Sequence, residues 1–212
     1  MNALRPVEEA QARLLALRAR LPSETIYFSQ SLGRYLSQDV VAMRDQPAAP
    51  LSAMDGYAIR HADLPGPWTI SGEIAAGSAP ASPLAAGGAM RIFTGAMLPE
   101  GADAVVMQED VAVAGPRLTL ATDDAIAPGQ HVRGRASDFA TGNILISAGT
   151  RLTPGAIAAA IMSGAAQLDV GKRPRVAILT TGDELVQPGH ELAPGQIPDS
   201  NGTMLAAMLA AE

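Results

Sequence analysis

The segment RVAILTTGDE, residues 175–184, indicates how the C-terminal part of this chain folds. Residues 176–179 form a short apolar run with turn-forming residues on both sides, which is typical of a strand buried on both faces of a parallel sheet. Residues 180–184 would then place hydroxyls, a glycine and two carboxylates at the carboxyl end of that strand, where open α/β sheets bind ligands. Only one short helical stretch follows residues 198–201. We therefore expect the start of an α/β domain, and interpret the chain as the front part of a larger enzyme with an incomplete reaction site.

The composition is that of a globular protein with one or two domains, each with a hydrophobic core: of 212 residues, 48% are hydrophobic and 17% charged. The net charge of -6 disfavours non-specific nucleic-acid binding, which requires a dense basic face. The absence of cysteine excludes disulfides, thiolate metal sites and cysteine nucleophiles. The three histidines, His61, His131 and His190, lie far apart in the sequence, so we expect no histidine zinc site.

Membrane and export signals are not evident in the sequence. No apolar run approaches the roughly 20 residues of a membrane-spanning helix. The N-terminus lacks the uninterrupted apolar core of a signal peptide. We therefore expect a cytoplasmic protein without a membrane partner.

Three segments carry helix signals. Residues 6–21 have proline and acids in the first turn and an apolar stripe at spacings of three and four. Ser29 as a cap predicts a second helix over residues 29–36. Thr153 as a cap, with Pro154 in the first turn, predicts a third helix to about Gly164. The stripe of the first helix consists of Val7, Ala10, Leu14, Leu17 and Leu21.

Between these helices the pattern changes to short apolar runs broken by glycine and proline, which predicts a small β-barrel-like or sandwich-like module. The runs are residues 68–70, 90–93, 104–107 and 117–120. A β region flanked by helices predicts an α+β multi-domain chain in which a β domain is inserted into a discontinuous helical lobe. The predicted divisions are 1–50 and 138–171 for the lobe, 51–137 for the β domain, and 172–212 for the truncated start of the α/β domain.

Two motifs in the β region could bind a ligand. Asp55 before Gly56 suits a tight turn whose carboxylate is free to accept hydrogen bonds, although a plain turn is the simpler explanation of this fragment alone, since Asp-Gly is the common turn pair. Thr94 before Gly95 can bind an oxyanion through its hydroxyl and the loop amides, but it is not a Walker P-loop, because no Gly-Lys-Ser or Gly-Lys-Thr follows. The acids of residues 108–110 suit either a hard cation or a solvated strand end.

Residues 180–184 together with 197–201 form the strongest cluster. Three carboxylates near the end of a buried strand could hold Mg²⁺ through oxygen ligands, directly or through water. Ser200 or Asn201 could equally cap the last helix, which requires no ligand.

Six motifs in a fixed order carry a family resemblance. They are SAMDGYA at 52–58, TG at 94–95, PEGADAVVMQE at 99–109, AGTRL at 148–152, TGDEL at 181–185 and GQIPDSN at 195–201. Together they resemble the N-terminal portion of the bacterial molybdopterin molybdotransferases, the family that includes the gephyrin E domain. The resemblance implies an elongated helical lobe, an inserted β domain and an α/β molybdopterin-binding domain that begins at about residue 174.

The resemblance also implies a reaction and partners. Family members use adenylylated molybdopterin and molybdate as substrates, together with a divalent cation such as Mg²⁺, and insert the metal into the dithiolene with release of AMP. They act as homodimers, in which the β domain of one subunit reaches the cleft of the other. The molybdopterin adenylyltransferase is a further candidate partner.

Site residues follow from the resemblance motif by motif. Molybdate and the pyrophosphate link are oxyanions, which a threonine hydroxyl and loop amides can bind, whereas carboxylates would hold the cation or a water. The implied catalytic residues are Asp55, Thr94 and Glu184; the implied cofactor-binding residues are Thr94, Gly95, Thr181, Gly182, Asp183 and Ser200; the implied metal ligands are Glu184 and Asp199.

Two departures from the family pattern matter. An Arg-Arg-x-Gly-Glu-Asp pattern is common in the family, whereas residues 133–138 read RGRASD, so only Asp138 matches. The family's Ser-Gly-Gly-Val-Ser, Pro-Gly-Lys-Pro and Pro-Gly-Asn-Pro loops do not occur in the 212 residues. We therefore expect no transferase activity from these residues alone. The alternative is a non-catalytic dimerisation or scaffold module of the gephyrin type, and whether the reading frame continues past Glu212 separates the two.

Overall fold

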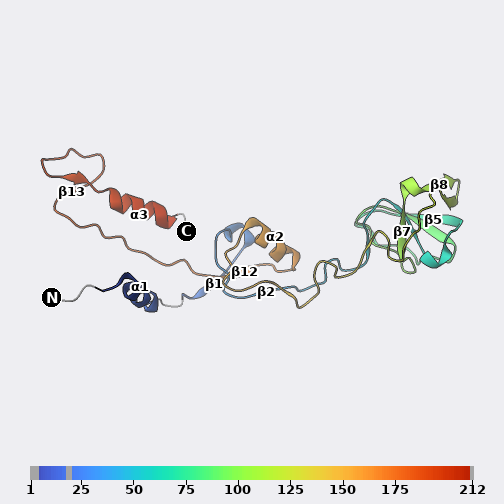
Figure 1. Ribbon diagram of the computed structural model, residues 1–212, viewed down its shortest axis with the longest axis horizontal. Coiled ribbons are helices and arrows are strands. Elements are labelled where there is room, and N and C mark those ends of the chain that lie inside the picture. Colours follow the sequence, from blue (N-terminus) through green and yellow to red (C-terminus); the bar gives the residue numbers. More distant parts are fainter. Residues whose placement is uncertain (1–4, 18–20, 211–212) are drawn as a thin grey trace. The chain divides into compact units, whose positions relative to one another are not determined.

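The computed structural model describes residues 5–17 and 21–210 (Figure 1). Within these residues there are three α-helices: α1 (Val7–Ala16), α2 (Pro154–Met162) and α3 (Ser200–Ala210). The chain divides into two compact units. The first consists of the described residues of Met1–Gln38, Ser147–Ile157 and Gln167–Glu212, and the second of Asp39–Ile146 and Ala158–Ala166.

A curled sheet of six strands forms the centre of the second unit. Its strands are β4 (Gly56–Ile59), β5 (Trp68–Ile74), β6 (Gly88–Ile92), β7 (Ala104–Met107), β8 (Val111–Ala114) and β9 (Arg117–Leu120), in the spatial order β7-β4-β6-β5-β9-β8. Strands β5 and β6 run parallel, and the other neighbours are antiparallel. A register shift between Ile70 and Gly72 interrupts the β5–β6 ladder, and such bulges bend a sheet. Each of the four apolar runs predicted as strands overlaps a strand of this sheet.

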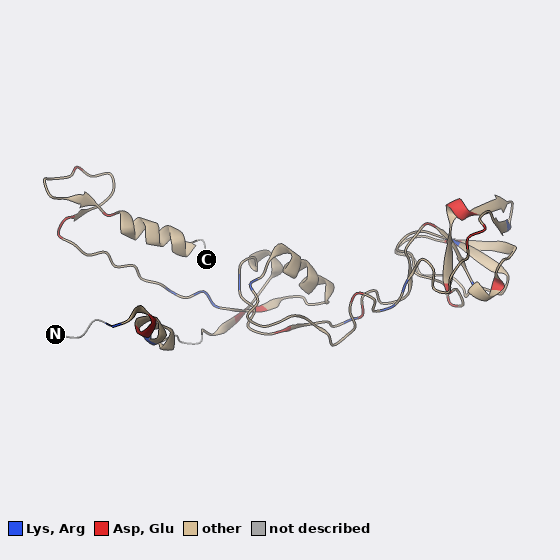
Figure 2. Cartoon of the chain, in the orientation of Figure 1, with Lys and Arg blue, Asp and Glu red and all other residues tan. Residues whose placement is uncertain are grey.

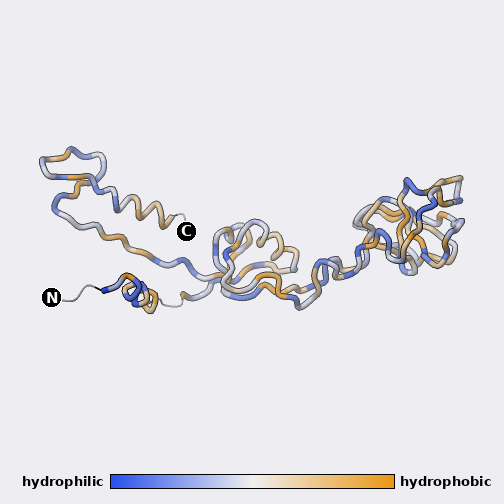
Figure 3. The backbone as a smooth tube through the Cα atoms, viewed as in Figure 1, coloured by the Kyte–Doolittle hydropathy of each residue, from blue (hydrophilic) through white to orange (hydrophobic). Residues whose placement is uncertain are grey.

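Strands β4, β6 and β7 are buried on both faces of the sheet, since successive residues of a strand point to opposite sides and most residues of these strands are buried. Ala58, Met90 and Val105 belong to one core cluster, whereas the residues that directly follow or precede them, such as Ile59 and Val106, belong to the other. Apolar segments accordingly gather within this sheet (Figure 3). The second cluster also contains the side chain of Trp68, of which 1% is exposed.

Short ladders join segments that are distant in sequence. In the first unit, β1 (Ser23–Ile26) pairs antiparallel with β12 (Leu168–Gly171). In the second unit, β2 (Val40–Val41) pairs with β11 (Ile144–Ile146), and β3 (Leu51–Ser52) pairs with β10 (Val132–Arg133). The chain segments that precede the six-stranded sheet therefore lie beside those that follow it. The ranges predicted as a helical lobe contain β1, β2, β11 and β12 as well as α1 and α2, and the detailed domain division stays a prediction.

Helix α2 begins as the sequence predicts. The hydroxyl of Thr153 accepts a hydrogen bond from the Ala156 N–H at 3.2 Å, which satisfies one of the free donors of the first turn. Helix α1 begins at Val7 and buries none of its residues. Its apolar stripe is solvent-exposed, at 69% for Leu14 and 79% for Leu17. The helix ends at Ala16 with Leu17 as its C-cap, short of the predicted end at Leu21, and residues 18–20 lie outside the described residues.

Two predicted elements are wrong. Residues 29–36 form no α-helix: a 3-10 turn, η1 (Phe28–Gln30), is followed by Gly33 at a φ of 75°, a left-handed conformation that ends helical geometry. Residues 176–179 form no buried strand, because no other strand in the described part of the chain is hydrogen-bonded to them. Leu179 is consequently 88% exposed. The C-terminal segment instead contains β13 (Leu185–Val186) and β14 (Ile197–Pro198), which pair parallel to each other ahead of α3.

A search for bilayer-spanning segments over residues 5–17 and 21–210 finds no helix with the length and apolar character that crossing requires.

Candidate functional site

The sheet register brings Asp55 and Thr94 together. Strand β4 starts one residue after Asp55, β6 ends two residues before Thr94, and Gly56 pairs with Ile92. The Thr94 N–H and the Thr94 hydroxyl both donate to Oδ1 of Asp55, at 2.7 and 2.8 Å. Two predicted catalytic residues that are 39 positions apart thus form a single hydrogen-bonded pair.

The pair leaves one carboxylate oxygen of Asp55 available. No donor among the described residues bonds to its Oδ2. The N–H of Thr94 and then its hydroxyl lower the pKa of Asp55 below its ordinary value, and the positive charge of Arg91 contributes in the same direction. Asp55 is therefore ionised at neutral pH, with one oxygen fixed and the other able to accept a hydrogen bond.

The loop that carries Thr94 does not present free amides. The Thr94 N–H bonds to Asp55, the Gly95 N–H donates to the Ser52 carbonyl at 2.8 Å, and the Ala96 N–H donates to the Phe93 carbonyl at 2.9 Å. Gly95 adopts a φ of 82°, which glycine tolerates better than other residues. Since these donors are used inside the protein, the loop fixes Asp55 and offers no ready-made oxyanion nest.

A hollow of about 360 Å³ lies at this pair. Its lining consists of Met54, Asp55, Thr94, Met107, Gln108 and Glu109. Gln108 and Glu109 belong to a 3-10 turn, η3 (Gln108–Asp110), and the Gln108 N–H donates to the Asp55 carbonyl at 3.1 Å. The hollow thus carries two carboxylates, those of Asp55 and Glu109. The sequence pattern indicated the acids of η3, but it did not indicate their proximity to Asp55.

The second group of predicted residues lies in the first unit. The Thr180 hydroxyl donates to Oδ2 of Asp199 at 2.6 Å, and the Gly202 N–H donates to Oδ1 at 3.1 Å. These bonds lower the pKa of Asp199, the bond from Thr180 most. Since α3 starts at Ser200, Asp199 is the capping residue, and the prediction that Ser200 or Asn201 caps this helix is wrong.

Glu184 and Asp199 are at opposite ends of one short ladder. Leu185 pairs with Ile197 and Val186 with Pro198 in parallel register, so Glu184 precedes the ladder and Asp199 follows it. In the part of the chain that the structure describes, no three or more histidine and acidic side chains gather as a metal site would require. The metal role of both residues stays a prediction, as does the ligand-binding role of Thr181, Gly182, Asp183 and Ser200, which are all exposed.

A third aspartate–threonine pair lies elsewhere in the second unit. Oδ1 of Asp45 accepts the Thr141 N–H at 2.8 Å and the Thr141 hydroxyl at 2.9 Å, and Oδ2 accepts the Arg135 Nε–H at 2.6 Å. The Thr141 N–H, the Thr141 hydroxyl and then Arg135 lower the pKa of Asp45 to about 2. Asp138, the one acid kept from the family pattern, accepts from Nη2 of Arg133 at 2.9 Å. Residues 133–138, which differ from the family pattern, therefore form ion pairs within the protein.

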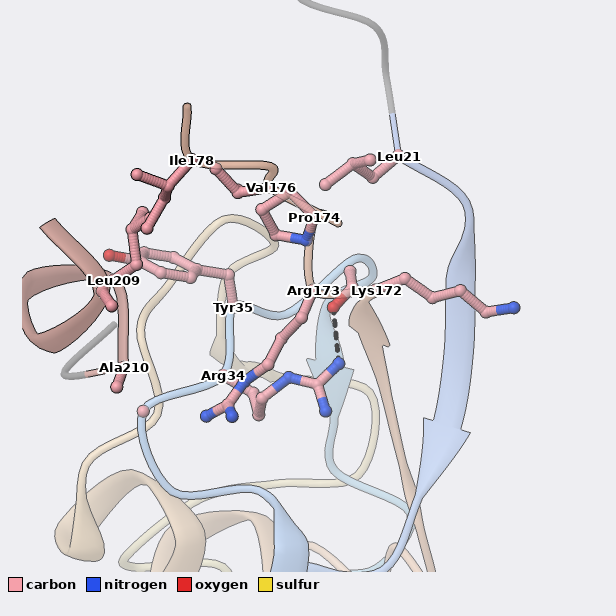
Figure 4. A pocket seen from close by; sticks show the side chains of 13 residues that line it. Leu21, Arg34, Tyr35, Lys172, Arg173, Pro174, Val176, Ile178, Leu209 and Ala210 are labelled. Atoms are coloured by element: carbon pink, nitrogen blue, oxygen red, sulfur yellow. Dashed lines mark hydrogen bonds between the residues drawn. The ribbon is translucent and has the colours of Figure 1, made fainter. Parts of the chain in front are cut away.

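A larger hollow of about 620 Å³ lies in the first unit (Figure 4). Val176 and Leu209 contribute apolar walls, and Lys172 and Arg173, which belong to the basic stretch after β12 (Figure 2), also line the hollow. The Arg34 guanidinium at its floor is already engaged, because it donates to the Gly171 carbonyl at 2.7 Å and to the carboxylate of Glu24. None of the predicted site residues lines this hollow.

Comparison with known proteins gives one consistent result. Residues 5–164 match the family described as the MoeA N-terminal region, domains I and II. A molybdopterin molybdenumtransferase from Nostoc sp. is 42% identical over 184 residues, which cover 84% of this chain and 42% of that protein. One from Staphylococcus aureus is 33% identical over 210 residues, covering 96% of this chain and 50% of that protein.

Solved structures agree with the sequence matches. Two crystal structures of the molybdopterin biosynthesis MoeA protein from Pyrococcus horikoshii align with TM-scores of 0.87 and 0.90, at 32% and 31% identity. Each alignment covers 98% of this chain, but 55% and 57% of the respective solved chains. The chain spans about half the length of the curated relatives it matches.

Proposed function

The chain belongs to the MoeA family, and we propose that it forms the N-terminal part of a molybdopterin molybdotransferase. The complete enzyme would insert molybdate into adenylylated molybdopterin and release AMP. The observation that carries this proposal is the Asp55–Thr94 pair, which lines a hollow and in which Oδ2 of Asp55 has no donor among the described residues. An Asp-Gly turn alone would not require two donors from a residue 39 positions away.

The geometry supports a specific role for each member of the pair. Because the N–H and the hydroxyl of Thr94 both donate to Asp55, we assign Thr94 to orienting that carboxylate, and not to binding an oxyanion. A carboxylate with a lowered pKa is a weak base but a permanently ionised acceptor. Oδ2 of Asp55 is thus suited to orient a water, or an N–H or O–H of the substrate, beside the phosphoanhydride that must be cleaved to release AMP.

The proposed Mg²⁺ fits the chemistry of Glu184 better than that of Asp199. Mg²⁺ is commonly held by one or two carboxylates together with substrate phosphates and water. Glu184 has an exposed side chain, whereas both oxygens of Asp199 already accept hydrogen bonds. When bound, the cation would supply positive charge that lets an anionic substrate approach acidic side chains.

Assay of AMP release tests the proposal. With adenylylated molybdopterin, molybdate and Mg²⁺, the full-length protein should release AMP, and the 212 residues alone should release little or none. This second expectation is supported by the segment 176–179, which has no strand partner in the described chain. Failure of the full-length protein to release AMP under these conditions would favour the scaffold alternative.

The partners are part of the same proposal. A homodimer is supported by the exposed apolar stripe of α1, since large exposed apolar side chains favour association. Sedimentation of the chain at several concentrations measures its self-association directly. Binding to the molybdopterin adenylyltransferase would appear as a faster-sedimenting mixed species.

A further inference from the structure

Arg91 is a charged residue in the middle of an otherwise apolar, central strand. It lies on β6, where the other four residues are buried, and pairs with Tyr57 of β4. Its guanidinium carbon is 5.3 Å from the ring centroid of Tyr57 and 4.9 Å from that of Phe93. Nη1 donates to the Gly56 carbonyl at 3.0 Å, and Nη2 donates to Oε1 of Gln108. Two aromatic rings and two acceptors therefore restrain one guanidinium.

These restraints act on the backbone around Asp55. The Gln108 N–H holds the Asp55 carbonyl, and Arg91 holds the next carbonyl along the chain, that of Gly56. A Cβ at Gly56 would lie 2.0 Å from the Val106 carbonyl oxygen, so the backbone has no space to shift in that direction. The backbone that carries the Asp55 side chain is therefore restrained by the hydrogen bonds to the Asp55 and Gly56 carbonyls and by the close contact at Gly56.

The same guanidinium sets the orientation of the Gln108 amide. An arginine can only donate, so Oε1 of Gln108 must face Arg91. The amide nitrogen is then directed at Oε1 of Glu109, to which it donates at 3.1 Å. Glu109, as an acceptor, favours the same orientation, so loss of Arg91 would remove one of the two restraints on the amide. Arg91 thus acts on the second carboxylate of the hollow through one intervening side chain.

We propose that Arg91 is a positioning residue that fixes both carboxylates of the hollow, Asp55 through the backbone of Gly56 and Glu109 through Gln108. It is not assigned as an anion ligand, because Nη1, Nη2 and both aromatic contacts are used inside the protein and Arg91 does not line the hollow. Its effect on the reaction rests on the proposed function, whereas its effect on the two side chains does not.

The first experiment requires no substrate. In the 212-residue chain, NMR should follow the Gln108 side-chain amide and the carboxyl titration of Asp55. Arg91→Lys keeps the charge but cannot replace the planar fork, so the Gln108 amide signals should shift and exchange faster. Arg91→Met removes the charge, so the pKa of Asp55 should rise toward its ordinary value. Glu109 of η3 is the other charged side chain at this hollow, and Glu109→Gln separates its contribution.

The matched control is Arg117→Lys on β9 of the same sheet, because Arg117 is exposed and forms no side-chain hydrogen bond in the described structure. It should leave both signals unchanged. Near-ultraviolet circular dichroism of the buried Trp68 reports whether each variant is folded. Unchanged Gln108 amide signals in a folded Arg91→Lys variant would overturn the inference.

The second experiment measures AMP release by the full-length protein. Loss of positioning should lower kcat of Arg91→Lys by about tenfold and leave KM for adenylylated molybdopterin nearly unchanged. A raised KM at unchanged kcat would instead identify Arg91 as a substrate ligand and refute the positioning role. Failure of the proposed function looks different: the unmodified full-length protein would then release no AMP, while the NMR result for Arg91 would still hold.

Discussion

The pairs Asp45–Thr141 and Asp55–Thr94 share one hydrogen-bond pattern but differ at a single oxygen. In each pair, the N–H and the hydroxyl of one threonine donate to Oδ1 of the aspartate. Oδ2 of Asp45 also accepts from Arg135, which completes an internal cross-link. Oδ2 of Asp55 has no donor among the described residues, because the nearest guanidinium, that of Arg91, is directed at Gly56 and Gln108.

This difference separates a structural aspartate from a candidate catalytic one. A carboxylate whose two oxygens both accept hydrogen bonds from the protein is committed mainly to the fold, whereas one with a single bonded oxygen is oriented and keeps its other oxygen for a ligand. The lowered pKa does not distinguish them, since it occurs in both. What distinguishes the two aspartates is whether Oδ2 accepts a hydrogen bond from the protein, and not how far the pKa is lowered.

The largest effect is expected from Gly56→Ala, which tests whether the sheet holds the Asp55 pair. The added Cβ would meet the Val106 carbonyl oxygen at 2.0 Å, and both strands belong to the central sheet. We expect a loss of about 3 kcal/mol of unfolding free energy, since backbone must move to relieve the overlap. Denaturant unfolding measures the loss. The Thr94 amide signal should shift more than that of Thr141, whose partner Asp45 precedes the sheet.

Gly72→Ala is the matched control on β5 of the same sheet. A Cβ there would meet nothing within 4 Å, so the change in stability should stay within about 0.5 kcal/mol. Equal losses in the two variants would contradict the claim that strand packing at Gly56 fixes the pair.

The second prediction compares Asp55→Ala with Asp45→Ala. We expect Asp55→Ala to lower the turnover of the full-length protein by about 100-fold with a small change in Tm, because it removes the free acceptor at the hollow. Asp45→Ala should do the reverse, since it breaks a bond to Arg135 and two to Thr141. AMP release and thermal unfolding measure the two effects. A large fall in Tm for Asp55→Ala with unchanged turnover would restore the plain-turn explanation of Asp55.

The sequence predicted the short strands of the β region and the Thr153 cap, because these depend on local residue patterns. It did not predict the helix-breaking turn at Gly33, nor that residues 176–179 would remain unpaired, since pairing depends on segments far away in the chain. It named Asp55 and Thr94 as separate motifs and through a family resemblance. Their contact depends on the β4–β6 register, which periodicity alone does not specify.

The residues that sequence reasoning missed are Arg91 and Gln108. The available signal was a single arginine within the apolar run of residues 90–93, two positions before Phe93 and so on the same face of a strand. Such a charge in a central strand needs partners, and the structure supplies them from β4 and η3. Asp45 was missed as well, because its partners Arg135 and Thr141 are about ninety residues away in the sequence.

A smaller effect is expected from removing one hydroxyl. Thr94→Val keeps the backbone N–H bond to Asp55 and loses the side-chain bond, so the carboxylate is less restrained. Turnover should fall by about tenfold, less than for Asp55→Ala. Thr141→Val makes the same change at Asp45 and should leave turnover unaltered. If the two valine variants have equal turnover, orientation by Thr94 does not contribute to the reaction.

The smallest effect concerns the acid side of the stability curve, where Asp45 should dominate the comparison. Its pKa is lowered from 3.8 to about 2 in the folded protein, so the unfolded chain takes up a proton first as the pH falls. The stabilisation is therefore complete above about pH 4 and is lost as the pH falls through about 2. The difference in Tm between the unmodified chain and Asp45→Asn should shrink over this window. In Arg135→Gln, which removes one of the bonds that lower this pKa, the stabilisation should be smaller and its loss should be complete at a higher pH. An unshifted acid profile would show that Arg135 does not stabilise the ionised form.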